Sequence, residues 1–214
     1  MIITIDGPVA SGKSSIAKAL AKHFGYHYLN TGLLYRAVAY LMQTQSHSDL
    51  AWLSDVSYEY CEGNPQVLFR GMPITVDLYN PTIDQEASRI SVDKDIREAL
   101  LPIQRSVGAK YDIVADGRDC GSIVFPEATV KLYLTADEAV RAERLMIDKQ
   151  RHYATMPFDA VVYEIAQRDA RDIERQVAPL IVPEGGIVVD ASGLTFDQTL
   201  VHCIELVEKK TKGD

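Results

Sequence analysis

The sequence predicts an α/β fold in which helices flank a parallel sheet and a small antiparallel β unit is inserted. Short β-branched runs alternate with amphipathic helical segments along most of the 214 residues, a pattern typical of parallel sheets covered on both faces. A glycine-rich stretch separates the first predicted strand from the first predicted helix. At about residues 49–89 this alternation is replaced by short, closely spaced β runs.

The chain begins with a buried strand, IITI, at residues 2–5. Apolar residues recur at helical spacing over 13–24, and Gly25 is a suitable stop for that helix. A strand at 26–30 and a helix at 33–42 follow.

The inserted unit is predicted from two β runs, QVLF and ITV, which flank RGMP within residues 64–76. We expect these runs to pair as a hairpin. Residues 49–62 begin with helical sequence and end with the strand-like VSYEY.

The second half of the chain returns to the α/β alternation. Asp93 is a candidate N-cap of a helix that Pro102 would bend or divide. Thr135 and Glu138 match a capping box at the start of a later helix. The remaining elements are strands at 111–115, 130–134 and 186–191, a loop at 151–158 and a last helix at 196–210.

The composition argues against several classes of protein. The formal net charge of −8 is unsuited to non-specific binding of nucleic acid or anionic lipid, which depends on excess lysine and arginine. No apolar run reaches the roughly 18 residues of a membrane span, and MIITID lacks the basic start of a signal peptide, so we expect a cytoplasmic protein. The spacing of Cys61, Cys120 and Cys203 suits neither a metal site nor a disulfide framework.

The glycine-rich stretch GPVASGKS, residues 7–14, matches the motif G-x-x-x-x-G-K-[ST] in full. Glycines let the backbone wrap so that N–H groups point at phosphate oxygens, and the following helix adds its positive dipole end. Lys13 would reach the β- and γ-phosphates, and the hydroxyl of Ser14 would bind Mg²⁺. A βα turn that binds nothing is the alternative. The strand before and the helix after favour a P-loop NTPase-type fold.

The P-loop alone does not define the reaction. The chain lacks the N-K-x-D base reader of GTPases. The strand before Asp116 continues into Gly-Arg-Asp instead of the Asp-Glu pair usual in motor ATPases. An arginine there indicates a second anion, because open α/β sheets bind ligands at the carboxyl ends of their strands.

Further arginines support a second phosphate site. Arg36 and Arg118 follow strands, and one helix face carries four charged residues at i, i+3, i+4 and i+7, namely Arg168, Arg171, Asp172 and Arg175. A solvated face of Arg–Asp pairs, each worth about 0.2–0.5 kcal/mol, is the alternative. Guanidinium groups bind phosphate bidentately, and beside a P-loop they suit phosphoryl transfer, which depends mostly on positioning and charge stabilisation.

Several segments together resemble the bacterial cytidylate kinase (CMP kinase) family from residue 2 to about residue 190. They are IDGPVASGKSS, NTGLLYRA, IREALLPIQR, VADGRDCGSIVFPEA, KLYLTA and RDARDIERQVAPL. The resemblance implies a P-loop nucleoside monophosphate kinase of one domain. Its core would be residues 1–48 and 90–214, its monophosphate-binding insertion about 49–89, and its short lid about 149–158.

The resemblance also implies site residues. ATP would contact Gly7, Pro8, Val9, Ala10, Ser11, Gly12, Lys13, Ser14, Ser15, Arg141 and Arg144. CMP would contact Thr31, its phosphate would be held by Arg36, Arg118 and Arg175, its base by Ser88, Arg97 and Asp119, and its sugar by Arg168 and Asp172. The catalytic set would be Lys13, Arg118, Arg171 and Arg175.

For the base-reading residues, simpler interpretations remain open on the sequence pattern. Ser88 could be a helix-surface serine, and Arg97 could pair with Asp93 on an exposed face. Asp119 could be a turn residue.

The sequence therefore predicts ATP-dependent phosphorylation of CMP and dCMP with Mg²⁺, by a monomer that binds neither nucleic acid nor membranes. Two alternatives stay open. One is another small P-loop kinase, acting on an acceptor such as shikimate or dephospho-coenzyme A. The other is a nucleotide-binding regulatory or toxin-like module without kinase activity.

Overall fold

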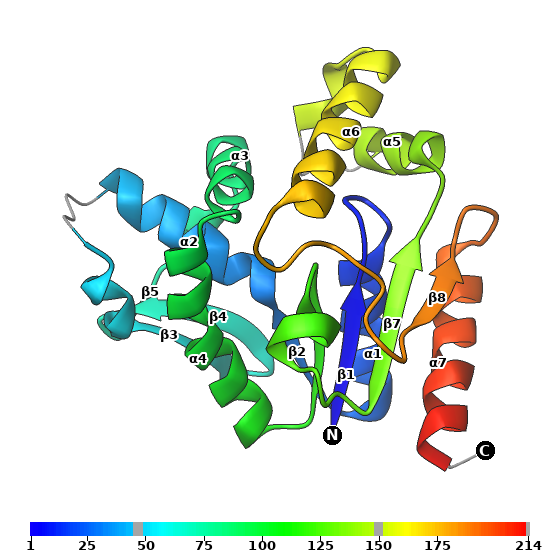
Figure 1. Ribbon diagram of the computed structural model, residues 1–214, viewed down its shortest axis with the longest axis horizontal. Coiled ribbons are helices and arrows are strands. Elements are labelled where there is room, and N and C mark those ends of the chain that lie inside the picture. Colours follow the sequence, from blue (N-terminus) through cyan, green and yellow to red (C-terminus); the bar gives the residue numbers. More distant parts are fainter. Residues whose placement is uncertain (45–48, 148–151, 213–214) are drawn as a thin grey trace.

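The computed structural model describes residues 1–44, 49–147 and 152–212. Its centre is a five-stranded sheet in the order β2-β6-β1-β7-β8, and every neighbouring pair is parallel (Figure 1). The strands are β1 (Ile2–Asp6), β2 (His27–Asn30), β6 (Ile113–Gly117), β7 (Val130–Thr135) and β8 (Ile187–Asp190). The predicted fold class is confirmed.

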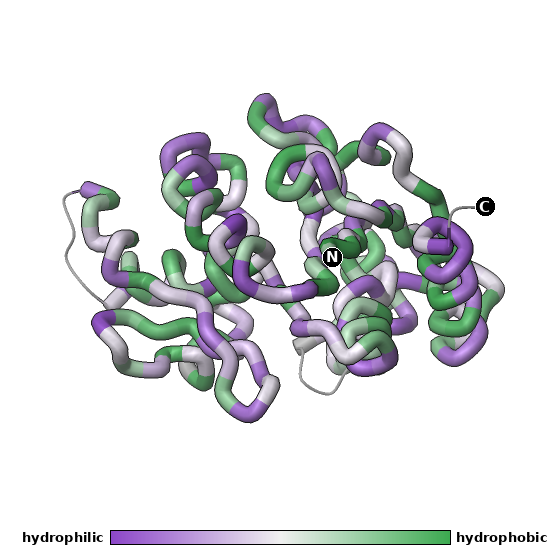
Figure 2. Tube along the Cα trace, turned by 90° about the horizontal axis from the view of Figure 1, so that it is seen from below, coloured by the Kyte–Doolittle hydropathy of each residue, from purple (hydrophilic) through white to green (hydrophobic). Residues whose placement is uncertain are grey.

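Helices cover both faces of this sheet, because successive strand residues point to opposite sides. On one face Ile3 and Ile5 pack with α1 (Lys13–Phe24) and α7 (Phe196–Lys212). On the other face Ile113 packs with α2 (Thr31–Thr44) and α4 (Lys94–Lys110). Figure 2 shows hydrophobic and hydrophilic segments alternating along the helices, as expected for helices with one buried face.

The inserted unit is a three-stranded antiparallel sheet in the order β3-β4-β5, followed by α3 (Pro81–Ile90). Its strands are β3 (Val56–Cys61), β4 (Asn64–Phe69) and β5 (Met72–Pro73). A 3₁₀ turn at Ala51–Asp55 precedes it.

The expected hairpin is present, because β4 pairs with β5 in antiparallel fashion, but its second strand is Met72–Pro73 and not ITV. The main partner of β4 is β3, and β5 contains only two residues. The run ITV instead enters a 3₁₀ turn, Thr75–Leu78. The reason is local: the hydroxyl of Thr75 accepts a hydrogen bond from the Val67 N–H at 2.8 Å and replaces the ladder bond that a longer strand would supply.

The predicted capping box also needs correction. Thr135 is the last residue of β7, and α5 (Glu138–Ile147) begins three residues later. The N–H of Asp137 donates to the Ser192 hydroxyl at 2.8 Å, so the start of α5 is tied to the segment after β8.

The predicted N-cap of α4 is confirmed, since the Asp93 carboxylate accepts from the N–H groups of Asp95 and Ile96. Helix α4 runs through Pro102 without being divided. Helix α6 (Phe158–Glu174) carries most of the predicted charged stripe, but Arg175 lies just beyond its end in an extended conformation.

The segment predicted as a loop and lid, 149–158, is only partly described, because residues 149–151 lie outside the described part. A 3₁₀ turn, His152–Thr155, and the start of α6 follow. Among the helices of the described residues, none combines the length and apolar character needed to cross a membrane.

Candidate active site

A cavity of about 1250 Å³ opens at the carboxyl ends of the parallel strands. The P-loop and the segment after β6 form its floor, while α2, α3 and α6 supply walls. Most of the predicted site residues line it: Val9, Ala10, Ser11, Gly12, Lys13, Ser14, Ser15, Thr31, Arg36, Ser88, Arg97, Arg118, Asp119, Arg144, Arg168, Asp172 and Arg175. Gly7, Pro8, Arg141 and Arg171 are not among its lining residues.

The P-loop wraps tightly between β1 and α1. Gly7 has a φ of 154°, and a Cβ at this position would lie 2.0 Å from the carbonyl oxygen of Leu134. Only glycine therefore fits so close to β7. Gly12, in the left-handed region, directly precedes α1 and turns the backbone into the helix. The first helical residue, Lys13, consequently points into the loop.

Lys13 is buried, and its Nζ donates to the carbonyl oxygen of Pro8 at 2.9 Å. Burial lowers the pKa of Lys13 well below its ordinary value, and the positive charge of Arg118 lowers it further. The site thus holds two cations close together, an arrangement that a bound anion would stabilise.

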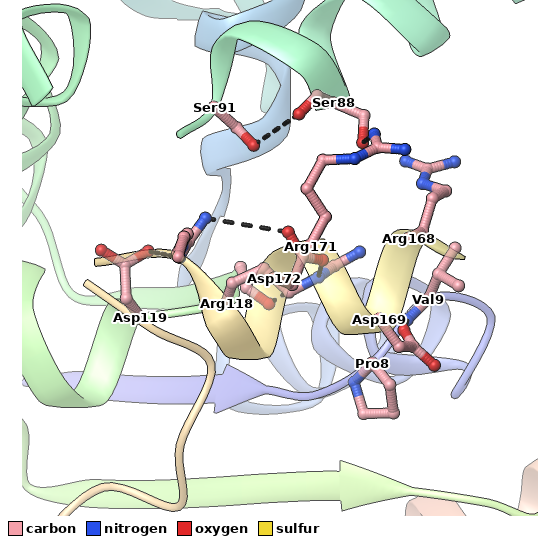
Figure 3. Close-up of polar contacts among 12 residues, drawn as sticks. Pro8, Val9, Ser88, Ser91, Arg118, Asp119, Arg168, Asp169, Arg171 and Asp172 are labelled. Atoms are coloured by element: carbon pink, nitrogen blue, oxygen red, sulfur yellow. Dashed lines mark hydrogen bonds and ion pairs between the residues drawn. The ribbon is translucent and has the colours of Figure 1, made fainter. Parts of the chain in front are cut away.

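A buried ion pair supports the loop from behind. The carboxylate of Asp169 in α6 accepts from the Val9 N–H at 3.1 Å, and Nη1 of Arg141 in α5 donates to the Val9 carbonyl at 3.0 Å. Arg141 and Asp169 also contact each other at 2.5 Å. Figure 3 shows Asp169 beside Val9. The structure places the Arg141 guanidinium beneath the loop, against the Val9 carbonyl. Direct contact of Arg141 with ATP therefore stays a prediction.

Oxygen ligands gather at the start of α1. The Ser14 hydroxyl donates to one carboxylate oxygen of Asp116 at 2.5 Å, and the Tyr28 hydroxyl donates to the other at 2.8 Å. Hydroxyl and carboxylate oxygens are the hard ligands that Mg²⁺ prefers, so these residues fit that ion. Thr31 is anchored nearby, where its hydroxyl donates to the Asp116 carbonyl at 2.8 Å. Arg144 donates to the carbonyl of Ser11 at 3.0 Å.

Opposite the P-loop, two carboxylates are each shared by two arginines. Asp172 accepts from Arg118 Nε at 2.7 Å (Figure 3). Asp172 also lies 3.8 Å from Arg175. Asp119 accepts from Arg97 and lies 3.6 Å from Arg175. Burial alone would raise the pKa of Asp172. The neighbouring arginines outweigh this effect, so the pKa of Asp172 lies below its ordinary value.

The guanidinium of Arg175 has a donor that could bind an anion. Its Nε donates to the carbonyl of Ala178 at 2.6 Å, which fixes the side chain. Its Nη2 is buried and finds no hydrogen-bond partner among the described residues, although the Asp119 carboxylate lies 3.6 Å away. A buried donor of this kind is costly unless a ligand completes it.

Among the predicted base readers, Arg97 does not adopt the simpler arrangement. Arg97 is buried, donates to the Ser91 carbonyl at 2.8 Å and lies over the ring of Tyr35. It reaches Asp119 instead of forming the exposed pair with Asp93. The Ser88 hydroxyl accepts from Arg171 Nη1 at 2.7 Å, which links α3 to α6.

Sequence reasoning missed Asp6, a buried carboxylate that shapes the segment after β6. Its two oxygens accept from the N–H groups of Cys120 and Gly121 at 2.8 and 2.7 Å. These bonds hold the π-helical turn Cys120–Val124, which directly follows Asp119. Burial raises the pKa of Asp6 to about 6, although the two backbone N–H groups oppose the shift.

This pKa predicts a pH-dependent stability. The folded protein keeps the Asp6 proton up to about pH 6, whereas the unfolded chain loses it near pH 4. The contribution of Asp6 to the free energy of unfolding should therefore fall by roughly 3 kcal/mol as the pH rises from about 4 to about 6, and then stay constant. Urea unfolding of the wild type and Asp6→Asn across this range measures it. A difference between the two proteins that does not change with pH contradicts the prediction.

The fold and the site indicate the class of protein. A parallel sheet with a P-loop that faces a cluster of arginines is typical of a small P-loop kinase. A solved shikimate kinase from Bacteroides thetaiotaomicron shares the fold, with a TM-score of 0.55 at 14% identity over 97% of this chain and 98% of that one. The cytidylate kinase family model matches residues 3–209, and the chain belongs to that family.

Named relatives agree with the family model. A cytidylate kinase from Lactobacillus johnsonii is 33% identical over 221 residues, covering 100% of this chain and 96% of the relative. One from Enterobacter sp. is 35% identical over 218 residues, covering 98% and 96%. The resemblance seen in the sequence is thereby confirmed, and the chain is a kinase of the nucleoside monophosphate class.

Proposed function

We propose that this chain transfers the γ-phosphoryl group of ATP to the 5′-phosphate of CMP or dCMP, giving CDP or dCDP and ADP. The observation that carries the proposal is the buried Nη2 of Arg175, which no group of the described residues hydrogen-bonds and which lies in a cavity that the P-loop also lines. Donor and acceptor phosphates require two anion sites that face each other, and the P-loop and the arginines that line this cavity support such a pair.

On the donor side, the P-loop N–H groups and Lys13 would hold the β- and γ-phosphates of ATP. Ser14 and Asp116 would hold Mg²⁺, which neutralises charge on the triphosphate when bound. Arg144 lines the same side of the cavity and would contact ATP.

On the acceptor side, Arg36, Arg118 and Arg175 would bind the CMP phosphate. Its oxygen is already anionic, so the transfer needs no side-chain general base. Arg171 would stabilise the transferring group, and closure over the site would exclude water and prevent hydrolysis of ATP.

The base and the sugar have their own residues. The N4 amino group of cytosine would donate to Asp119, while O2 and N3 would accept from Arg97 and Ser88. Arg168 and Asp172 would contact the sugar. Burial of Arg97 and Asp119 supports this assignment, because each has a fixed orientation before substrate binds.

We also propose the division into a core of residues 1–48 and 90–214, an insertion of about 49–89 and a lid of about 149–158. The separate antiparallel sheet and α3 support the insertion. We also propose a monomer located in the cytoplasm. One chain suffices for the proposed reaction, since most of the residues assigned to the two substrates line one cavity of a single chain.

A coupled assay of ADP formation tests the function, with ATP and each of CMP, dCMP, UMP, AMP and shikimate. The proposal requires turnover with CMP or dCMP at a kcat/KM far above that with shikimate. Turnover with shikimate alone would favour the metabolite-kinase alternative. ATP binding without turnover of any acceptor would favour a regulatory module.

A further inference from the structure

One carboxylate on α3 lies among the arginines of the cavity and was not predicted as part of the site. Oδ1 of Asp84 accepts from Arg36 Nη2 at 2.6 Å, and its Oδ2 accepts from Arg168 Nη1 at 3.2 Å. Asp84 lines the cavity, and its side chain is 14% exposed. The Asp84 carboxylate therefore contacts two of the guanidinium groups proposed to bind CMP.

These contacts connect three walls of the cavity. Asp84 and Ser88 are one turn apart on α3 and contact Arg168 and Arg171, which are three residues apart on α6. Figure 3 shows Arg168 and Arg171 extending from α6 toward Ser88. Through Arg36, the same carboxylate also ties α3 to α2. The insertion is thus held against the core by bonds to arginines of the acceptor site.

Of the two arginines that Asp84 contacts, Arg36 is proposed to bind the CMP phosphate, and it has a better ligand in a phosphate monoester. A phosphate carries a charge of about −1.5 to −2 at neutral pH and three acceptor oxygens, whereas a carboxylate carries −1 and two. A phosphate at Arg36 would also be repelled by a carboxylate that remains there. The acceptor phosphate and the Asp84 carboxylate therefore compete for Arg36.

We propose that Asp84 is an internal competitor of the acceptor phosphate: the phosphate must displace the Asp84 carboxylate from Arg36 in order to bind there. The inference rests on the proposed function, because it takes the acceptor to be a nucleoside monophosphate. Displacement breaks the tie that Asp84 makes between α3 and α2, so the insertion can rearrange around the substrate. A nucleoside without a phosphate leaves the carboxylate in place and is thereby disfavoured.

The test is isothermal titration of the wild type and Asp84→Asn with CMP, cytidine and inorganic phosphate, in the absence of ATP. Asparagine keeps the shape but removes the competing charge. We expect the Kd for CMP and for inorganic phosphate to fall by about tenfold in the variant, and the Kd for cytidine to stay unchanged. Asp84→Ala serves as a second variant with the same expected direction if the asparagine variant folds poorly.

Glu86→Gln is the matched control. It removes one negative charge from the same helix, at a surface pair with Arg89 that is not part of the cavity lining. We expect all three dissociation constants to stay at wild-type values in this control. If the control gained as much affinity as Asp84→Asn, net charge would explain the effect and the proposal would be overturned.

Two results at Asp84 also overturn the proposal. One is an unchanged or weaker affinity for CMP and phosphate, which would mean that Asp84 helps to position the arginines. The other is tighter binding of CMP without tighter binding of phosphate, which would place the effect on the nucleoside. If the wild type binds inorganic phosphate but not CMP, the proposed function fails, and the phosphate titrations still decide the role of Asp84.

Discussion

Replacing Lys13 with alanine should lower kcat by about 10³-fold or more while the protein stays folded. Lys13 is the buried cation of the P-loop. Among the described residues, its Nζ donates a hydrogen bond only to the carbonyl oxygen of Pro8, at 2.9 Å. A cation preorganised beside the transferring phosphoryl is worth about 4 kcal/mol in comparable sites, which corresponds to that factor in rate. The fold should tolerate the change, because burial and Arg118 both disfavour the charge of Lys13 without a ligand.

The measurement is kcat in the coupled assay together with the thermal midpoint of the free protein. Lys18→Ala is the matched control, since Lys18 lies exposed on the same helix. The control should keep wild-type turnover. Near-normal turnover of Lys13→Ala would remove Lys13 from its phosphate-binding role.

Asp119→Ala should raise the KM for CMP by about 10- to 100-fold and change the KM for ATP little. The proposed bond from cytosine to this carboxylate is a charge-assisted hydrogen bond, worth about 1.5–3 kcal/mol. The substitution also removes the partner of two buried arginines, Arg97 and Arg175, so a loss of stability of about 3–5 kcal/mol is expected. Kinetics must therefore be corrected for the folded fraction, and Asp119→Asn gives a better-folded version of the test.

Asp95→Ala provides the control, because Asp95 is exposed at the start of α4, the helix that carries Arg97. Both Michaelis constants should stay at wild-type values in this control. Equal increases in the KM for CMP and the KM for ATP in Asp119→Ala would show that Asp119 does not read the base.

The fold was predictable where the chain alone fixes the local structure. Strand-loop-helix alternation, the P-loop and the Asp93 cap depend on neighbouring residues, and the structure agrees with them. The strand order of the sheet depends on pairing between distant segments, which no local pattern specifies. ITV was misjudged because a single hydroxyl, that of Thr75, replaced a strand bond.

The site shows the same division. The P-loop is contiguous, so its motif alone located it, and the remaining positions came from the resemblance to a family. Sequence reasoning missed the acids that hold these groups in place, Asp6, Asp84 and Asp169. Their partners are far away in the chain: Asp84 and Arg36 are 48 residues apart, and Asp169 and Val9 are 160 apart. No sequence motif marks these acidic residues, so their distant partners can be identified only in the folded structure.

The central claim is that one cavity holds ATP and CMP at the same time and passes a phosphoryl group directly between them. Initial rates of CDP formation, with ATP and CMP varied together and the γ-phosphate of ATP labelled, test it most directly. Direct transfer within one cavity should give intersecting double-reciprocal lines, with the label in the β-phosphate of CDP and none on the protein. Parallel lines with labelled protein, or no CDP at all, would contradict it.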